Sequence, residues 1–214
     1  DLGDLIGITG TVATSKTGEL SIRLQNWQMV GKCLSPVPPI DVELADDVRA
    51  RNRTLYLITH RAPLAMLEQR ARGVRALRES LHADDFIEVE TPMLQTVHGG
   101  AAARPFTTHI NAYDQQLSLR IAPELYLKRL CVAGMGRIYE LNRNFRNEGA
   151  DSTHNPEFTS LEVYQAYAGY NTMKGLAQTL ICAMATAIHG AQVAERPSPP
   201  EKNRPSISTA RGRP

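Results

Sequence analysis

The sequence predicts an α+β fold, and three observations support that prediction. Residues 137–145 and 157–167 alternate polar and apolar side chains, as strands with one solvated face do. Residues 62–82 and 171–188 instead carry apolar side chains at helical spacing. Residues 5–24 alternate again and are interrupted by glycine, which indicates a separate group of strands at the start of the chain.

Strands and a linker are expected before the first long helix. We expect a strand over Leu5–Val12, a turn at Ser15–Gly18 and an alternating strand over Glu19–Leu24. The proline-rich run Ser35–Pro39 follows. It predicts a stiff linker, because proline holds the backbone extended.

A helix is predicted over residues 62–82, with a strand after it. Its apolar stripe consists of Leu64, Leu67, Ala71, Val74, Leu77 and Leu81. Residues Phe86–Leu94 follow as a strand that is ended by proline. By themselves these two elements are an ordinary helix–strand unit and assign no function.

Two further helices are predicted from the signals at their ends. Pro123 and Gly134 bracket one of them, since proline suits a first helical turn and glycine suits a helix end. Asn171 is expected as the N-cap of the other, and Gly190 as its stop. The stripe of this last helix predicts core packing and consists of Leu176, Leu180 and Met184.

Polar side chains gather on one face of the hairpin predicted from residues 137–145 and 157–167. In phase on that face are Ile138, Glu140, Asn142, Asn144 and Arg146, then Phe158, Ser160, Glu162, Tyr164 and Ala166. The opposite face is apolar and carries Tyr139, Leu141, Phe145, Leu161, Val163 and Tyr167. The loop Glu148–Pro156 is long and polar for a simple connection. The pattern predicts a functional site, although an ordinary amphipathic hairpin gives the same alternation.

The residue types on that face suit a phosphate, a flat base and an ammonium group. Arg146 carries a planar guanidinium that matches phosphate or carboxylate oxygens. Phe158 offers a stacking face, while Glu148 and His154 could hydrogen-bond a base edge or phosphates. Ordinary interpretations are a surface pair of Arg146 with Glu148, a core phenylalanine and a solvated loop histidine. Amino groups could be received by Glu124, Glu162 and Tyr164.

The composition narrows the class of protein. The 214 residues contain 24 Lys+Arg against 22 Asp+Glu, an excess too small to indicate nucleic-acid binding by itself. Three scattered cysteines, Cys33, Cys131 and Cys182, show no metal-ligand spacing, so we expect a reduced cytoplasmic protein. No apolar run is long enough to span a bilayer, and no signal peptide is visible. The chain begins at Asp1 rather than methionine, which leaves room for an upstream start.

Several strings of residues carry a family resemblance: Gly99–Phe106, Arg120–Leu130, Phe145–Glu148 with His154–Phe158, and Glu162–Tyr164. The string before and after the polar loop resembles motif 2 of class II aminoacyl-tRNA synthetases. The others resemble the lysyl-tRNA synthetase family of the bacterial type. The helix and strand of residues 62–94 are similar to the dimer-forming motif 1. Several long strings in family order are more specific than one short motif, and the resemblance covers roughly Asp1–Ala168.

The resemblance implies a domain organisation. Residues 1–34 would be the C-terminal part of an oligonucleotide-binding (OB-fold) barrel that grips the anticodon, and residues 35–61 a linker. Residues 62–191 would be the first half of the class II antiparallel-sheet catalytic domain, with motifs 1 and 2. Residues 192–214 are rich in proline, serine and arginine, and we expect them to be a disordered tail.

The resemblance also implies an activity, that of an ATP-dependent lysine-tRNA ligase. The lysine carboxylate attacks the α-phosphate of ATP, which gives lysyl-adenylate and pyrophosphate, and the lysyl group then passes to tRNA. Arg146 would be the catalytic residue that bridges the carboxylate and the α-phosphate. ATP would be bound by Arg146, Glu148, His154 and Phe158, and lysine by Gly100, Glu124, Glu162 and Tyr164. The implied partners are lysine, tRNA and a second copy of the chain bound through motif 1.

The chain departs from the family pattern in three places. Motif 3, a glycine-rich strand and helix with an arginine for the γ-phosphate, has no counterpart. The expected Mg²⁺ ligands and the glutamate that meets the lysine side-chain ammonium belong to that region, so this chain would hold no metal by itself. Gln192–Pro214 shows no likeness to the family. Asp84–Phe86 lacks a preferred glycine, and Arg53–Ile58 departs from the usual pattern, both at the expected dimer contact.

These departures predict an incomplete chain that is inactive alone, and they leave other functions open. One alternative is a non-catalytic synthetase-like paralogue that binds ATP, tRNA or a synthetase partner. Another is a protein-lysine ligase, against which the barrel remnant argues. Some bacterial relatives fuse a lysyl-tRNA synthetase to a membrane domain that makes lysyl-phospholipid, and such a domain could precede Asp1.

Overall fold

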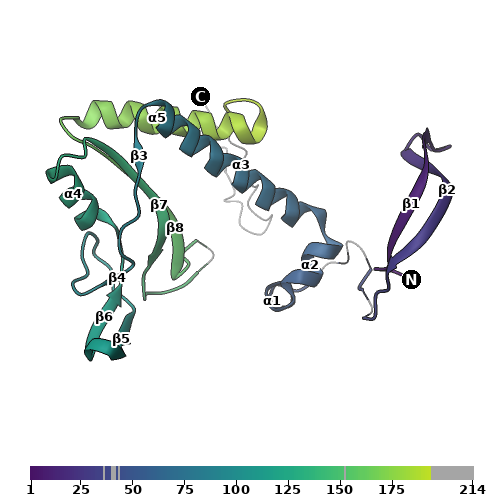
Figure 1. The fold of residues 1–214 in the computed structure, drawn as a ribbon, viewed down its shortest axis with the longest axis horizontal. Helices are drawn as coiled ribbons and strands as arrows, with labels where there is room; N and C mark the ends of the chain where they lie inside the picture. Colours follow the sequence, from purple (N-terminus) through teal and green to yellow (C-terminus); the bar gives the residue numbers. More distant parts are fainter. Residues whose placement is uncertain (36, 40–41, 43, 152, 194–214) are drawn as a thin grey trace, which may run out of the picture. The chain divides into compact units, whose positions relative to one another are not determined.

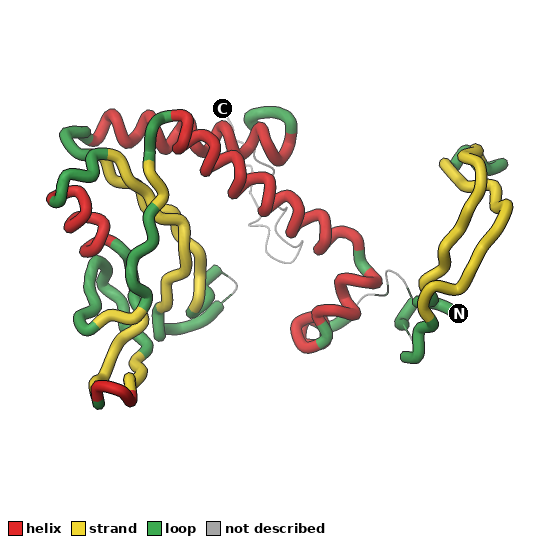
Figure 2. Tube along the Cα trace, viewed as in Figure 1, coloured by secondary structure: helices red, strands yellow, loops and turns green. Residues whose placement is uncertain are grey.

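A computed structural model of the chain describes residues 1–35, 37–39, 42, 44–151 and 153–193 (Figure 1). The chain divides into two compact units, Asp1–Gln69 and Arg70–Pro214. Both units combine strands and helices, so the α+β prediction is confirmed at that level (Figure 2). Most of the predicted tail, residues 194–214, lies outside the described residues.

The first unit opens with the predicted hairpin. Strand β1 (Leu5–Thr14) pairs antiparallel with β2 (Leu20–Gly31). The turn at Ser15–Gly18 is confirmed: the Ser15 amide donates to the Glu19 carbonyl at 2.8 Å, and Gly18 has a φ of 89°. Gly10 lies at a register shift, where an added Cβ would collide with the Arg23 carbonyl, so glycine is required by close backbone approach.

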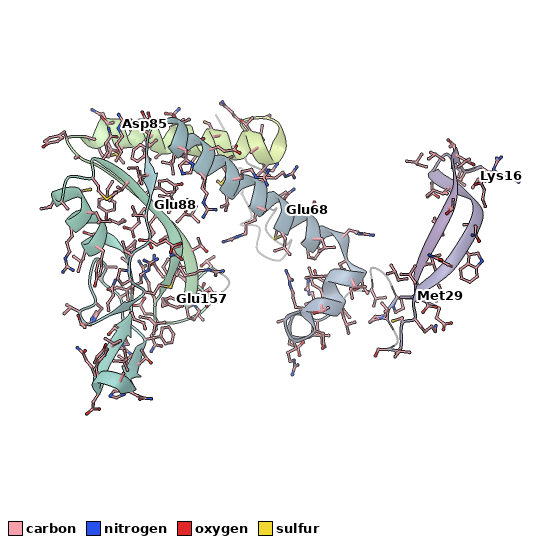
Figure 3. All side chains as sticks on the ribbon, in the orientation of Figure 1. Lys16, Met29, Glu68, Asp85, Glu88 and Glu157 are labelled. Atoms are coloured by element: carbon pink, nitrogen blue, oxygen red, sulfur yellow. The ribbon has the colours of Figure 1, made fainter. Side chains whose placement is uncertain are left out.

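Within the described part of this unit, the sheet has two strands, so an OB-fold barrel is not shown. Large apolar side chains are exposed along both strands, and Met29 projects from β2 in Figure 3. A two-stranded hairpin buries little apolar surface and is only marginally stable in water by itself. The assignment of residues 1–34 to such a barrel therefore stays a prediction.

The segment 35–61 stays a predicted linker, and it contains two short helices. Helix α1 spans Asp46–Arg51 and α2 spans Arg53–Thr59. Asn52 separates them with a non-helical φ of −110° and ψ of 49°. Each helix is too short to show an apolar stripe, which is the signal that the sequence analysis relied on.

The second unit is built on a three-stranded sheet in the order β3-β7-β8. Strand β7 (Arg137–Phe145) pairs antiparallel with β8 (Glu157–Gln165), which confirms the predicted hairpin. Strand β3 (Ile87–Glu88) runs parallel to β7. The strand predicted over Phe86–Leu94 is wrong in length, since only its two ends are strand residues.

A second three-stranded sheet has the spatial order β4-β6-β5. Its strands are β4 (Leu94–Gln95), β5 (Thr107–Ile110) and β6 (Gln115–Leu119), with the short 3-10 helix η1 (Asn111–Tyr113) between the last two. The two sheets are joined at the end of β6, where the Phe145 amide donates to the Arg120 carbonyl at 3.0 Å.

Helices α4 (Glu124–Val132) and α5 (Tyr170–His189) complete this unit together with the part of α3 (Arg61–Ala83) that follows Gln69. Helices α3 and α5 pack on the apolar face of β7 and β8, with a core formed by Leu81, Phe86, Tyr139 and Leu180 and flanked by Leu77, Leu141, Leu161, Val163 and Leu176. Figure 1 shows α3 and α5 crossing on the same side of these strands. The opposite, polar face of the hairpin is thus left for the candidate site.

The predicted helix ends hold with one correction. Gly190 has a left-handed φ of 73° and ends α5, as expected. The N-cap of α5 is Gly169 rather than Asn171, because the helix already begins at Tyr170. Helix α4 lies between Pro123 and Gly134, as predicted, and its Leu127 is buried.

Helix α3 ends in a Schellman motif that places an aspartate where glycine is preferred. The Phe86 amide donates to the Leu81 carbonyl at 2.9 Å, and the Asp85 amide donates to the His82 carbonyl at 3.1 Å. Asp85 therefore occupies the C′ position, with a φ of 58°. Phe86 and Leu81 also meet in the core, which is the apolar contact typical of this motif. The departure from the family pattern at Asp84–Phe86 thus places a residue with a Cβ in the left-handed region, which costs some backbone conformational energy.

We expect Asp85→Gly to stabilise the chain by about 0.5–1 kcal/mol, because glycine adopts the left-handed region without a Cβ penalty. Urea unfolding followed by circular dichroism measures this. The control is Glu79→Gly, an exposed position inside the same helix, which should cost about 1 kcal/mol. Loss of stability in Asp85→Gly would contradict the C′ assignment.

Candidate active site

The strand register places the predicted site residues of β8 on one face of the sheet. Glu162 lies opposite Glu140, and Phe158 lies opposite Asn144. Directly paired residues of antiparallel strands project to the same face. Tyr164 shares that face because it is two residues from Glu162. The predicted segregation of polar and apolar faces is therefore present in the structure.

A pocket of about 230 Å³ lies where β7 and β8 run into their connecting loop. It is lined by Arg146, Glu148, Gly149, Thr153, His154, Asn155, Pro156 and Phe158. The structure thus brings together the four residues predicted to bind ATP.

Arg146 and Phe158 are in contact inside this pocket. The guanidinium carbon of Arg146 lies 5.0 Å from the centroid of the Phe158 ring. Its Nε is buried and has no hydrogen-bond partner among the described residues. A buried guanidinium donor without an acceptor is costly, and an anionic ligand would satisfy it. This orphaned donor marks the pocket as suited to a phosphate or carboxylate.

The backbone fixes where Arg146 lies. Its amide donates to the Pro156 carbonyl at 2.8 Å, which continues the hairpin past the end of β7. Glu148 does not form the surface pair with Arg146 that was the ordinary interpretation. Its carboxylate instead accepts from the Arg104 amide at 3.3 Å, and the Asn147 amide donates to the Arg104 carbonyl at 2.8 Å. The loop is therefore tied to the segment before β5.

Asp151 fixes the orientation of His154 in the pocket, and the sequence did not predict this role. Its Oδ1 accepts from the amides of Thr153 and His154, at 2.7 and 2.8 Å. It also lies 2.9 Å from Nδ1 of His154, which leaves Nε2 as the ring nitrogen that could reach a ligand. These bonds, from Thr153 above all, lower the pKa of Asp151 to about 2. The available signal was an aspartate three residues before a histidine in a polar loop, typical of an Asx turn.

A second group of predicted residues lies further along the same sheet face. Tyr164 donates its hydroxyl to Oε2 of Glu162 at 3.2 Å, and both side chains are partly buried. Burial raises the pKa of Glu162, and the charge of nearby Glu124 acts in the same direction. The pKa of Tyr164 is raised too, by burial first and then by the charge of Glu162. The phenol therefore stays a hydrogen-bond donor.

Glu124 and Gly100 complete this second group. Glu124 is the first residue of α4 and forms an ion pair with Lys128 through Oε1. An added Cβ at Gly100 would lie 2.9 Å from the Glu124 Cβ and 3.5 Å from its Oε2. Gly100 also has a φ of 86°, so a side chain would be strained there. Gly100 therefore approaches α4 closely, and the Glu124 carboxylate lies beside its backbone.

The family follows from these residues and from comparison with known proteins. Residues 45–210 match the family described as tRNA synthetases class II (D, K and N). The chain belongs to this family. The match extends past Gln192, so the expectation that likeness ends there was wrong. The predicted resemblance to class II synthetases is confirmed.

The most similar class II relatives carry two kinds of name. The chain is 53% identical over 198 residues to the lysylphosphatidylglycerol biosynthesis bifunctional protein LysX of Nocardia farcinica, covering 92% of the chain and 18% of that relative. It is 50% identical over 193 residues to the lysine–tRNA ligase of Kineococcus radiotolerans, covering 90% of the chain and 39% of that relative. The chain thus spans well under half the length of these relatives.

The described part of this class II chain offers neither a metal cluster nor a membrane span. Among the described residues, no group of three or more His, Cys, Asp or Glu side chains could hold a metal ion. Within the same residues, no helix is long and apolar enough to cross a membrane.

Proposed function

We propose that the chain carries the ATP- and lysine-binding residues of a lysine–tRNA ligase. One observation carries this proposal: a single sheet face holds a guanidinium–aromatic pocket at one end and a carboxylate group at the other. The first suits the α-phosphate and the base of ATP. The second suits an ammonium group, and similarity to a relative named lysine–tRNA ligase supports lysine as the ligand that carries it. The transfer to tRNA and a homodimer through α3 and residues 86–94 stay predictions.

The geometry supports a separate role for each pocket residue during adenylate formation. Arg146 would hold the α-phosphate and the lysine carboxylate together while a carboxylate oxygen bonds to phosphorus and pyrophosphate leaves. Positioning and charge stabilisation of this kind supply most of the rate enhancement in such a reaction. Phe158 would stack the adenine, His154 would reach the nucleotide through Nε2, and Glu148 would line the base. The described residues provide no cluster for the Mg²⁺ that is expected in the complete enzyme.

At the other end, Glu162 and Glu124 would receive the α-ammonium group of lysine, with Tyr164 beside them. The hydroxyl of Tyr164 donates to Glu162 and so fixes the orientation of that carboxylate. Since protonation removes the negative charge of Glu162, lysine affinity should fall as the pH falls through its pKa. Because burial raises that pKa, the loss should occur at a higher pH than for an exposed glutamate.

A second candidate shares this chemistry and differs in its product. The similarity to LysX supports a role of the chain in a longer bifunctional protein of lysylphosphatidylglycerol biosynthesis. Activated lysine is the common requirement, so the same residues would serve in both cases. A non-catalytic paralogue would keep ATP binding and lose lysine-dependent pyrophosphate exchange when joined to the rest of a synthetase.

Glu162→Gln tests the amino-acid end of the proposal. We expect lysine binding to weaken roughly tenfold or more, since a charged hydrogen bond is lost, while ATP affinity changes less than about twofold. Calorimetry of the chain with lysine and with ATP separates the two ligands, and GTP serves as the competing base.

The matched control is Glu157→Gln on the same strand. Glu157 pairs with Phe145 on the opposite face and forms an exposed ion pair with Arg143 at 3.0 Å (Figure 3 labels it). We expect this variant to bind lysine as the parent does. Equal losses in both variants, or no lysine heat in the parent, would refute the assignment.

A further inference from the structure

A buried ion pair lies next to Glu162, at the end of the site that is proposed to bind lysine. Arg120 and Glu140 are 0% and 1% exposed, and their Nη1 and Oε1 atoms lie 2.6 Å apart. Nη1 of Arg120 also donates to the Thr91 hydroxyl at 3.0 Å, and the same hydroxyl donates to Oε2 of Glu140 at 2.6 Å. Nε of Arg120 donates to the Arg143 carbonyl at 2.9 Å. The pair thus joins the end of β6 to strand β7.

Glu140 lies directly opposite Glu162 in the β7–β8 register. Like charges directly opposite each other on a sheet face are destabilising. Glu124 adds a third carboxylate close enough to influence Glu162, although Lys128 compensates it. This end of the site therefore concentrates negative charge in a partly buried place, and the guanidinium of Arg120 lies within it.

One nitrogen of the Arg120 guanidinium is not used by its partners. Its Nη2 is buried and has no hydrogen-bond partner among the described residues. Arginine stays charged in proteins, so burying it with an unused donor costs folding free energy. We therefore expect its charge to have a role in the site. Glu140 binds this guanidinium at Nη1 and stands opposite Glu162 in the register, and the charge of Arg120 acts on the carboxylate of Glu162.

We infer that Arg120 is a positioning residue of the amino-acid pocket: it offsets Glu140 so that Glu162, directly opposite, stays ionised and receives the ammonium group of the substrate. The inference rests on the proposed function only for the identity of that substrate. Its electrostatic part concerns residues of this chain alone.

The charges around Glu162 come from four elements. Tyr164 lies on its own strand, Glu140 on β7, Glu124 with Lys128 on α4, and Arg120 after β6. Burial raises the pKa of Glu162, the Tyr164 hydrogen bond lowers it, Glu124 and Glu140 raise it, and Arg120 lowers it. Arg120 is thus the arginine that works against the two neighbouring carboxylates.

Three variants separate this electrostatic role from a structural one. Arg120→Met should move the Glu162 titration to higher pH, because Glu140 loses its counter-charge. Glu140→Gln should move it to lower pH, because Arg120 is then uncompensated. The double variant Arg120→Met with Glu140→Met removes both charges and should return the titration close to that of the parent. Apolar replacement of a whole buried ion pair is often tolerated, so this variant should fold.

The experiment is carbon-detected NMR titration of the Glu162 side-chain carboxyl in the 214-residue chain, without ligand. Opposite shifts in the two single variants support the inference. Shifts in the same direction, or an unchanged titration in Glu140→Gln, would overturn it. Each single variant leaves one buried charge without its partner, Glu140 in Arg120→Met and Arg120 in Glu140→Gln, so each is at risk of unfolding. The double variant removes both charges, and a Glu162 titration in it that differs clearly from that of the parent would also overturn the inference.

Lysine calorimetry on the same variants supplies the second readout. We expect roughly tenfold weaker lysine binding in Arg120→Met at neutral pH, and binding near that of the parent in the double variant. Absence of lysine binding in the parent would refute the proposed function while the titration still tests the inference. Normal lysine binding in the parent with a titration that ignores both charges would refute the inference alone.

Discussion

Arg146→Ala is expected to weaken ATP binding by roughly 30- to 150-fold, which corresponds to about 2–3 kcal/mol. The reason is the position of the guanidinium. It lines the pocket with Phe158, and its buried Nε has no partner among the described residues. A phosphate oxygen would supply that partner and a charge-assisted hydrogen bond. Calorimetric titration of the chain with ATP measures the change directly.

Arg143→Ala is the matched control for loss of positive charge. Arg143 lies on β7, three residues before Arg146, pairs with Thr159, and belongs to the face opposite the pocket. Its side chain is half exposed and forms a surface ion pair with Glu157 at 3.0 Å. Surface pairs of this kind contribute little, so both ATP affinity and stability should stay near those of the parent. Equal weakening by both variants would mean that the pocket attracts ATP through general charge, which contradicts the assigned role.

Arg146→Lys refines the same test. Lysine keeps the charge but loses the planar fork, so it should restore part of the affinity. Recovery to the parent value would show that a point charge is enough. A folded Arg146→Ala chain with unchanged ATP affinity would refute the nucleotide pocket as a whole.

Sequence periodicity was sufficient for the hairpin because one of its faces is buried. Tyr139 and Leu141 on β7 face the core, so every second residue is constrained, and the polar face follows from the alternation. The same alternation predicts that Phe158 and Glu162 lie on one side of β8, as the register shows. The resemblance then added Gly100, whose closeness to Glu124 no local pattern could indicate.

What the sequence could not show depends on contacts between distant segments. The two helices in residues 46–59 are shorter than the window in which a periodic stripe can be recognised. Arg120 and Glu140 are polar residues in a buried place, and only the structure shows that they satisfy each other. Asp151 could not be predicted for another reason. Its role depends on the loop conformation that its own hydrogen bonds create.

Leu81→Ala is expected to destabilise the second unit by about 2–5 kcal/mol. Leu81 is fully buried and lies in the core with Phe86, Tyr139 and Leu180. Truncation removes apolar contacts and leaves a cavity at the point where α3, α5 and the sheet meet. It also removes one half of the apolar contact that accompanies the Schellman motif. Urea unfolding followed by circular dichroism is the suitable measurement, because the single tryptophan, Trp27, lies in the other unit.

Leu67→Ala makes this prediction specific. Leu67 belongs to the same helix and the same predicted stripe, and sequence alone gives it the same standing as Leu81. Its side chain is nevertheless 46% exposed, so truncation should cost less than about 1 kcal/mol. A large loss in Leu67→Ala would show that this part of α3 is covered in solution. Because α3 belongs to the element expected to form the dimer, unfolding measured at several protein concentrations would then distinguish a self-associated chain from a buried monomer core.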